Sequence, residues 1–162
     1  MAERSDRQAD YSAAVYGSLL AGSVVAGAGQ GRDLTPPLTL MALLLATGLV
    51  FWLAHAYARL VGDRIRDGMR GWAELRGIAR AEAPLATAAV PPAAMAAVGW
   101  LAGLSDSTTA WLCLLVAVAE QVGWAMIAAL RNGSSRRFAA ASAIVNLGLG
   151  LIIIALKAGL AH

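Results

Sequence analysis

A few polar side chains set inside long apolar stretches are the residues of this chain that could do chemistry. Glu120, directly followed by Gln121, lies near the middle of the stretch 110–130, and Asn146 lies near the middle of the stretch 138–160. At about 1.5 Å of helix rise per residue, Glu120 and Asn146 come to the same depth. A charged side chain at the centre of a bilayer costs about 2.5–3.5 kcal/mol, so such residues mark ion or proton paths by default. We therefore expect Glu120 to bind or relay a cation or a proton, with Gln121 or Asn146 supplying neighbouring oxygens.

A purely structural interpretation of the same residues stays open. A protonated Glu120, hydrogen-bonded to a neighbouring helix, would hold helices together without moving an ion. His55 lies in the inner half of the stretch 38–60, about two helical turns closer to the cytoplasm than Glu120. We expect a neutral imidazole bonded to a hydroxyl or a carbonyl there, with a pH-sensing role as the alternative.

Hydroxyl groups near the start of the chain form a second candidate feature. Ser12, Tyr16 and Ser23 are four and seven residues apart, so on a helix they share one face. Such a stripe could line a hydrated path. The alternative is that each serine bonds back to a carbonyl of its own helix.

The elements that must position these residues are long apolar runs. The 162 residues are 59% hydrophobic and only 14% charged, against about 45–50% and about 25% in soluble domains. This composition excludes an ordinary soluble enzyme, a disordered chain and a nucleic-acid-binding protein. A membrane-spanning helix needs about 20 apolar residues. We predict an all-α, polytopic integral membrane bundle of five transmembrane helices in a single domain, with spans at about residues 11–29, 37–61, 83–104, 108–130 and 138–160.

The basic residues predict the orientation of these spans. All lysines and arginines except Arg32 and Lys157 fall before the first span, between the inner end of the second span, where Arg59 lies, and the third, or between the fourth and fifth. Because basic loops stay in the cytoplasm, we expect a cytoplasmic N-terminus and an external C-terminus. Trp100 and Trp111 bracket the short loop 105–107, as an interfacial aromatic belt would.

The segment 62–82 is the one sizeable predicted extramembrane piece. Ile65, Met69, Trp72, Leu75 and Ile78 recur at steps of three and four among arginines and acids, which indicates a cytoplasmic amphipathic helix. It could lie on the inner leaflet, with arginines near anionic lipid, or extend the second span and pack on its neighbours.

Small residues at spacings of four predict close helix contacts. Gly17 and Ala21 form one such pair in the first span, and Asn146 and Gly150 have the same spacing in the fifth. Small residues let helix backbones approach each other in lipid. The contact could lie inside one bundle or between copies of a homo-oligomer.

No arrangement of residues points to an enzyme. No nucleophile stands with a histidine and a carboxylate, and the glycine-rich run 27–31 lacks the lysine of a phosphate-binding loop. The single cysteine, Cys113, excludes an intramolecular disulfide, and no spacing suggests a zinc site. We expect no catalytic residue, no metal site and no cofactor.

Two segments resemble a known family. The segment 7–12, Arg-Gln-Ala-Asp-Tyr-Ser, resembles the Arg-x-x-x-Phe-Ser-Asp motif on the first helix of the prokaryotic relatives of the lysosomal potassium channel, with Tyr11 in place of Phe and Ala13 in place of Asp. The segment 51–55, Phe-Trp-Leu-Ala-His, looks like the Trp-x-x-His of that family's second helix. Together they cover about the first third of the chain.

This resemblance implies a first helix that lines a pore on the axis of a tetramer. It implies a potassium or proton leak, with Arg7, Ser12 and His55 as a structural network near the pore. A second, architectural likeness is to the vacuolar iron transporter family, through Val-Tyr-Gly at 15–17, five spans and a helical segment after the second. That family needs acidic ligands on its first helices, which the first span lacks, so iron transport is not expected.

The sequence therefore predicts a small cation (potassium or proton) channel or transporter that acts as a homo-oligomer in the plasma (inner) membrane of a bacterium. The alternative is a non-conducting structural or accessory membrane protein whose polar residues serve helix packing. Expected partners are the lipid bilayer, further copies of the chain and a monovalent cation, and no nucleic acid. The candidate residues are Glu120, Gln121, Asn146, His55, Ser12, Tyr16 and Arg7.

Overall fold

The computed structural model describes residues 2–28, 34–67 and 71–160, and the side chains from Tyr11 onwards except those of residues 63–67, 74 and 160. Over these residues the chain forms helices and no strands, so the all-α prediction is confirmed. The helices are α1 (Ala2–Gly27), α2 (Pro37–Asp67), α3 (Trp72–Ala81), α4 (Ala83–Thr87), α5 (Val90–Leu101), α6 (Asp106–Arg131) and α7 (Arg136–Leu160).

Four helical segments of the described chain are long and apolar enough to cross a membrane, which indicates an integral membrane protein. They are Pro37–Gly62, Leu75–Leu101, Asp106–Arg131 and Arg136–Gly159. The predicted first span corresponds to Tyr11–Gly27, which is apolar but only 17 residues long. That length is at the lower limit of about 17–25 residues for a spanning helix, so the count of five stays a prediction.

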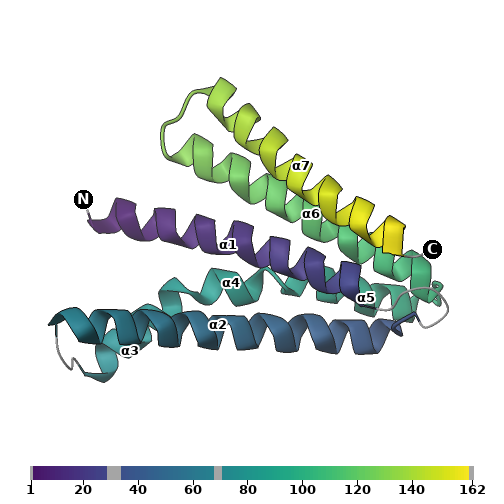
Figure 1. The fold of residues 1–162 in the computed structure, drawn as a ribbon, viewed down its shortest axis with the longest axis horizontal. Helices are drawn as coiled ribbons and strands as arrows, with labels where there is room; N and C mark the ends of the chain where they lie inside the picture. Colours follow the sequence, from purple (N-terminus) through teal and green to yellow (C-terminus); the bar gives the residue numbers. More distant parts are fainter. Residues whose placement is uncertain (1, 29–33, 68–70, 161–162) are drawn as a thin grey trace.

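The helices run roughly alongside one another and alternate in direction (Figure 1). α1 lies between the α6–α7 pair and the layer of α2 and α4. One end of the bundle, here called the arginine end, holds the start of α1, the end of α2, α3 and the α6–α7 turn. It carries Arg59, Arg131, Arg136 and Arg137. The basic segments that the sequence assigned to one side of the membrane thus lie at one end of the bundle.

Glycines set the closest helix contacts. A Cβ atom on Gly17 would lie 2.6 Å from the carbonyl oxygen of Leu85, so α1 touches the backbone of α4 there. A Cβ atom on Gly150 would lie 2.6 Å from Cγ1 of Val118, where α7 crosses α6. Both predicted small-residue contacts are therefore made inside one copy of the chain. They bring the backbones together where apolar lipid supplies no hydrophobic force between helices.

The predicted third span is a broken helix. Pro91 and Pro92 stand in the first turn of α5, where a proline's missing N–H costs nothing. The short α4 precedes them, and Ala88 and Ala89 connect the two helices. Gly17 of α1 and Gly48 of α2 both pack closely against this broken segment, at residues 85–89.

The segment 62–82 is largely helical and folds against the end of α2. α2 continues to Asp67, and α3 follows with Ile78 buried and Trp72 exposed. Trp52 Nε1 donates a hydrogen bond of 2.8 Å to the carbonyl oxygen of Ala79, which fastens α3 to α2. Arg59 and Glu82 add an ion pair of 2.7 Å. The side chains of Ile65 and Met69 lie outside the described residues, so the full predicted apolar face is not compared.

Candidate functional site

Two amide side chains join α6 to α7 at mid-depth. Gln121 Nε2 donates to Asn146 Oδ1 at 3.2 Å and to the carbonyl oxygen of Asn146 at 3.3 Å. Asn146 Nδ2 donates to the carbonyl oxygen of Ser142 at 3.0 Å, and Gln121 is only 1% exposed. We call Gln121 and Asn146 the amide pair. Each group satisfies part of the other's hydrogen-bonding need, which lowers the cost of holding them in an apolar bundle.

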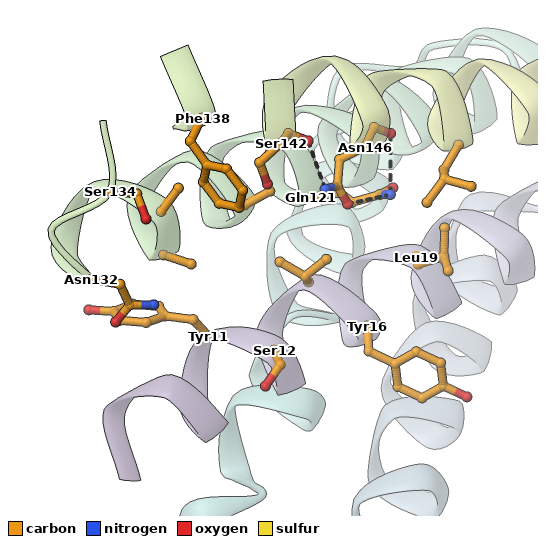
Figure 2. A pocket seen from close by; sticks show the side chains of 15 residues that line it. Tyr11, Ser12, Tyr16, Leu19, Gln121, Asn132, Ser134, Phe138, Ser142 and Asn146 are labelled. Carbon is orange, nitrogen blue, oxygen red and sulfur yellow. Dashed lines mark hydrogen bonds between the residues drawn. The ribbon is translucent and has the colours of Figure 1, made fainter. Parts of the chain in front are cut away.

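The amide pair lies near the inner end of a cleft of about 500 Å³ between α1, α6 and α7 (Figure 2). Clefts of about 300–1,000 Å³ are the size that binds small molecules. Four sequence candidates meet here: Ser12 and Tyr16 from α1, and the two amides. The remaining lining residues are Tyr11, Val15, Leu19, Ala125, Ala128, Ala129, Asn132, Ser134, Phe138, Ser142 and Leu149.

The cleft is open toward the arginine end and closed beyond the amide pair. α1 and the α6–α7 pair diverge toward the arginine end and converge toward the other end (Figure 1). Where they converge, a Cβ atom on Gly22 would lie 3.8 Å from Ala117, Leu114 and Ile153. The three helices thus form a V whose narrow end is filled by small and aliphatic side chains.

An aromatic and cationic cluster stands at the mouth of the cleft. Arg131 Nη1 donates to the hydroxyl of Tyr11 at 2.7 Å, and its guanidinium carbon lies 5.9 Å from the centre of the Tyr11 ring. The Tyr11 ring lies 6.0 Å from the ring of Trp124. A guanidinium over an aromatic face is attractive, so these contacts bridge α1 to α6 at the open end of the V.

Glu120, the leading candidate from the sequence, does not line the cleft. Its Oε1 accepts a hydrogen bond of 3.2 Å from Trp124 Nε1, one turn along α6. Its Oε2 is buried and has no hydrogen-bond partner among the described residues. Successive helix residues point about 100° apart, so Glu120 and Gln121 face different neighbours. The expected joint site of Glu120 with the amide pair is therefore not formed within one copy.

His55 bonds locally on α2. Its Nδ1 lies 3.0 Å from the carbonyl oxygen of Phe51, which can only accept, so Nδ1 carries the proton of this bond. The predicted bond to a carbonyl is thus present. The ring centre lies 5.7 Å from that of Tyr16, whose backbone stands at the edge of the cleft. Ser12 lines the cleft, and the side chain of Arg7 lies outside the described residues.

Sequence reasoning missed two contributors to this site, Ser142 and Arg131, and one contact that holds the narrow end of the V together. Ser142 precedes Asn146 by four residues, so helical spacing could have placed it on the same face. Arg131 was counted only as a charge that sets orientation. Lys157, whose Nζ donates to the carbonyl oxygen of Val25 at 2.9 Å, carried no signal beyond its place in an apolar run.

Scans against family models, curated proteins and solved structures found no match.

Proposed function

We propose that this protein is an integral membrane transport protein of the plasma (inner) membrane of a bacterium. The main support for this proposal is the cleft, which runs from the arginine end to the amide pair. Beyond the amide pair the helices are closely packed. Transporters commonly hold their cargo near the bilayer midplane, at polar groups between helices. A one-sided cleft that ends at mid-depth is what such a protein presents when open to one side only.

The proposal includes five spans, with the arginine end in the cytoplasm. Tyr11 contacts Arg131 at one end of α6, while Val25 contacts Lys157 near the far end of α7. α1 therefore accompanies two candidate spans over most of their length, which supports its crossing with them. The arginines at one end support a cytoplasmic N-terminus through the positive-inside rule.

The chemistry of the cleft favours an organic cargo. The described lining is mostly aliphatic and aromatic, with amides and hydroxyls as its polar groups and no carboxylate. Arg131 stands at the mouth and disfavours the approach of a bare cation. A molecule with an apolar body and a hydrogen-bonding or anionic group suits this lining better.

A second candidate is the cation or proton path expected from the sequence. Glu120 favours it, because a buried Oε2 without a partner among the described residues is a costly group that an ion or a second copy would satisfy. Such a path would run outside the cleft, in a homo-oligomer. The non-conducting alternative uses the amide pair and Glu120 as packing contacts alone.

Flux in reconstituted liposomes tests these candidates. Potassium, protons and a fluorescent phospholipid would each be offered to the wild type and to Ala128→Leu, which narrows the cleft. The matched control is Ala119→Leu, an exposed position on the same helix outside the cleft. We expect Ala128→Leu alone to lower flux of the organic cargo several-fold. Ion flux that is lost in Glu120→Gln and kept in Ala128→Leu would select the second candidate, and no flux of any kind would leave the non-conducting protein.

A further inference from the structure

The length of the cleft matches one leaflet of a bilayer. On α6 the lining runs from Gln121 to Asn132, the residue after Arg131, which is about 16 Å at about 1.5 Å per residue. The hydrocarbon core of a bilayer is about 30 Å thick, so one leaflet contributes about half of it. A lipid tail that starts beside Arg131 would therefore end at the amide pair.

The walls of the cleft are suited to such a tail, and the cleft is open along its side. Val15, Leu19, Ala125 and Leu149 supply apolar surface on all three helices. Lining residues remain accessible along its edge on α7, where Leu149 is 42% exposed and Phe138 61%. Figure 2 shows α1 and α7 facing one another across the cleft. In a membrane this side opening faces lipid.

The mouth of the cleft carries positive charge that the described side chains leave unneutralised. Arg136 and Arg137 begin α7, directly before Phe138 of the cleft lining, and both are exposed. They add to the positive end of the helix dipole. None of the three described carboxylates neutralises these arginines. Glu82 forms an ion pair with Arg59, Glu120 lies midway along α6, and Asp106 lies at the end of the bundle opposite the arginine end. Guanidinium groups bind phosphate strongly and in a defined geometry.

We propose that the cleft binds an anionic phospholipid of the leaflet at the arginine end, and that this lipid is the cargo. One acyl chain lies between α1 and α7 down to the amide pair, and the phosphate lies against Arg136 and Arg137. The inner leaflet is rich in anionic lipid, which matches the proposed orientation. The binding site rests on the cleft and its charges, whereas the role of cargo rests on the proposed function.

Photolabelling of the full chain in nanodiscs tests the binding site. The probe is phosphatidylglycerol with a diazirine near the end of one acyl chain, and the comparison is phosphatidylcholine with the same chain. The charge variant is Arg136→Gln with Arg137→Gln. Its matched control is Arg76→Gln with Arg80→Gln, two exposed arginines of α3 at the same end.

We expect phosphatidylglycerol to label residues 121–129 and 142–149 several-fold more than phosphatidylcholine does. The charge variant should lose this preference, and the α3 control should keep it. Equal labelling by the two lipids would overturn the charge recognition. Leu49 and Val50 are exposed on α2, away from the cleft. If they were labelled as strongly as the cleft residues, the labelling would indicate boundary lipid only and would overturn the site.

Translocation of fluorescent phosphatidylglycerol across liposomes separates the two claims. Cleft labelling without translocation would keep the binding site and reject transport of this lipid. Flux of another cargo without cleft labelling would keep the proposed function and reject the lipid site.

Discussion

Lys157, near the end of α7, donates a hydrogen bond of 2.9 Å to the carbonyl oxygen of Val25 in the last turn of α1. Lys157 is 7% exposed and Val25 is fully buried. A carbonyl in the last helical turn lacks a partner within its own helix, and the negative end of the helix dipole attracts a cation. The contact fastens α1 to α7 at the narrow end of the V, opposite the Tyr11–Arg131 bridge at its wide end.

Replacing Lys157 should loosen this narrow end. Lys157→Met keeps most of the side chain's length but leaves the Val25 carbonyl unsatisfied, which costs about 1–3 kcal/mol of unfolding free energy. Thermal unfolding in detergent measures the loss. Leu156→Met, an exposed neighbour on the same helix, is the control and should change little. Equal melting of the two variants would contradict a structural role for this hydrogen bond.

Gly17→Ala should destabilise the bundle. The added Cβ meets the backbone carbonyl of Leu85 at 2.6 Å, and backbone cannot give way as a flexible side chain can. Overpacking of this kind costs about 1–3 kcal/mol. Gly123→Ala on α6 is the control, because nothing lies within 4 Å of its added Cβ and alanine favours a helix. We expect the two variants to shift the melting temperature in opposite directions, and a stable Gly17→Ala would refute the close contact of α1 with α4.

The amide pair should show an energetic coupling in a double-mutant cycle. Gln121→Leu removes the donor to Asn146 Oδ1, and Asn146→Leu removes its acceptor. Hydrogen bonds between membrane helices contribute about 0.6 kcal/mol on average, so the double variant should be that much less destabilised than the sum of the single ones. Unfolding free energies in mixed micelles give the four corners of the cycle. Strict additivity would mean that the two amides do not act together.

Tyr11→Phe should open the mouth of the cleft. It removes the hydroxyl that accepts from Arg131 and leaves the aromatic ring in place. A cysteine introduced at Ser142 would then react several-fold faster with a polar thiol reagent, while the buried Cys113 stays protected. Tyr57→Phe, at an exposed position on α2, is the control. An unchanged rate would show that the Tyr11–Arg131 bridge does not limit access.

Thiol labelling in oriented vesicles tests the topology. Single cysteines at Trp72 and Asn132 should react from the cytoplasmic side, and one at Ser107 from the outside. Trp72 begins α3 and Asn132 follows the last residue of α6, whereas Ser107 lies in the first turn of α6. Figure 1 shows α3 and the end of α6 at the arginine end and the start of α6 at the other end. Reaction of residues 72 and 132 from opposite sides would overturn the proposed five-span arrangement.

The sequence predicts the depth of a residue in the membrane far better than the neighbour that its side chain faces. Counting along apolar runs placed Glu120 and Asn146 at one level, and the structure joins Asn146 by a hydrogen bond to Gln121, the residue after Glu120. The grouping of the arginine segments at one end followed from charge alone. The orientation of the Glu120 side chain could not be predicted from the sequence. Helices in lipid are apolar on every side, so hydrophobic periodicity does not mark the face that contacts protein. The contact of Lys157 with Val25 joins residues that are 132 positions apart, so no local sequence pattern predicts it.

The V of α1, α6 and α7 also sets the order in which the bundle comes apart. Regions with few buried contacts open locally at low free-energy cost, while densely packed regions stay closed until global unfolding. Amide protons around the α6–α7 turn should therefore exchange with water earlier than those beside Leu114 and Ile153. The three helices can therefore separate at the arginine end while their packed end stays intact.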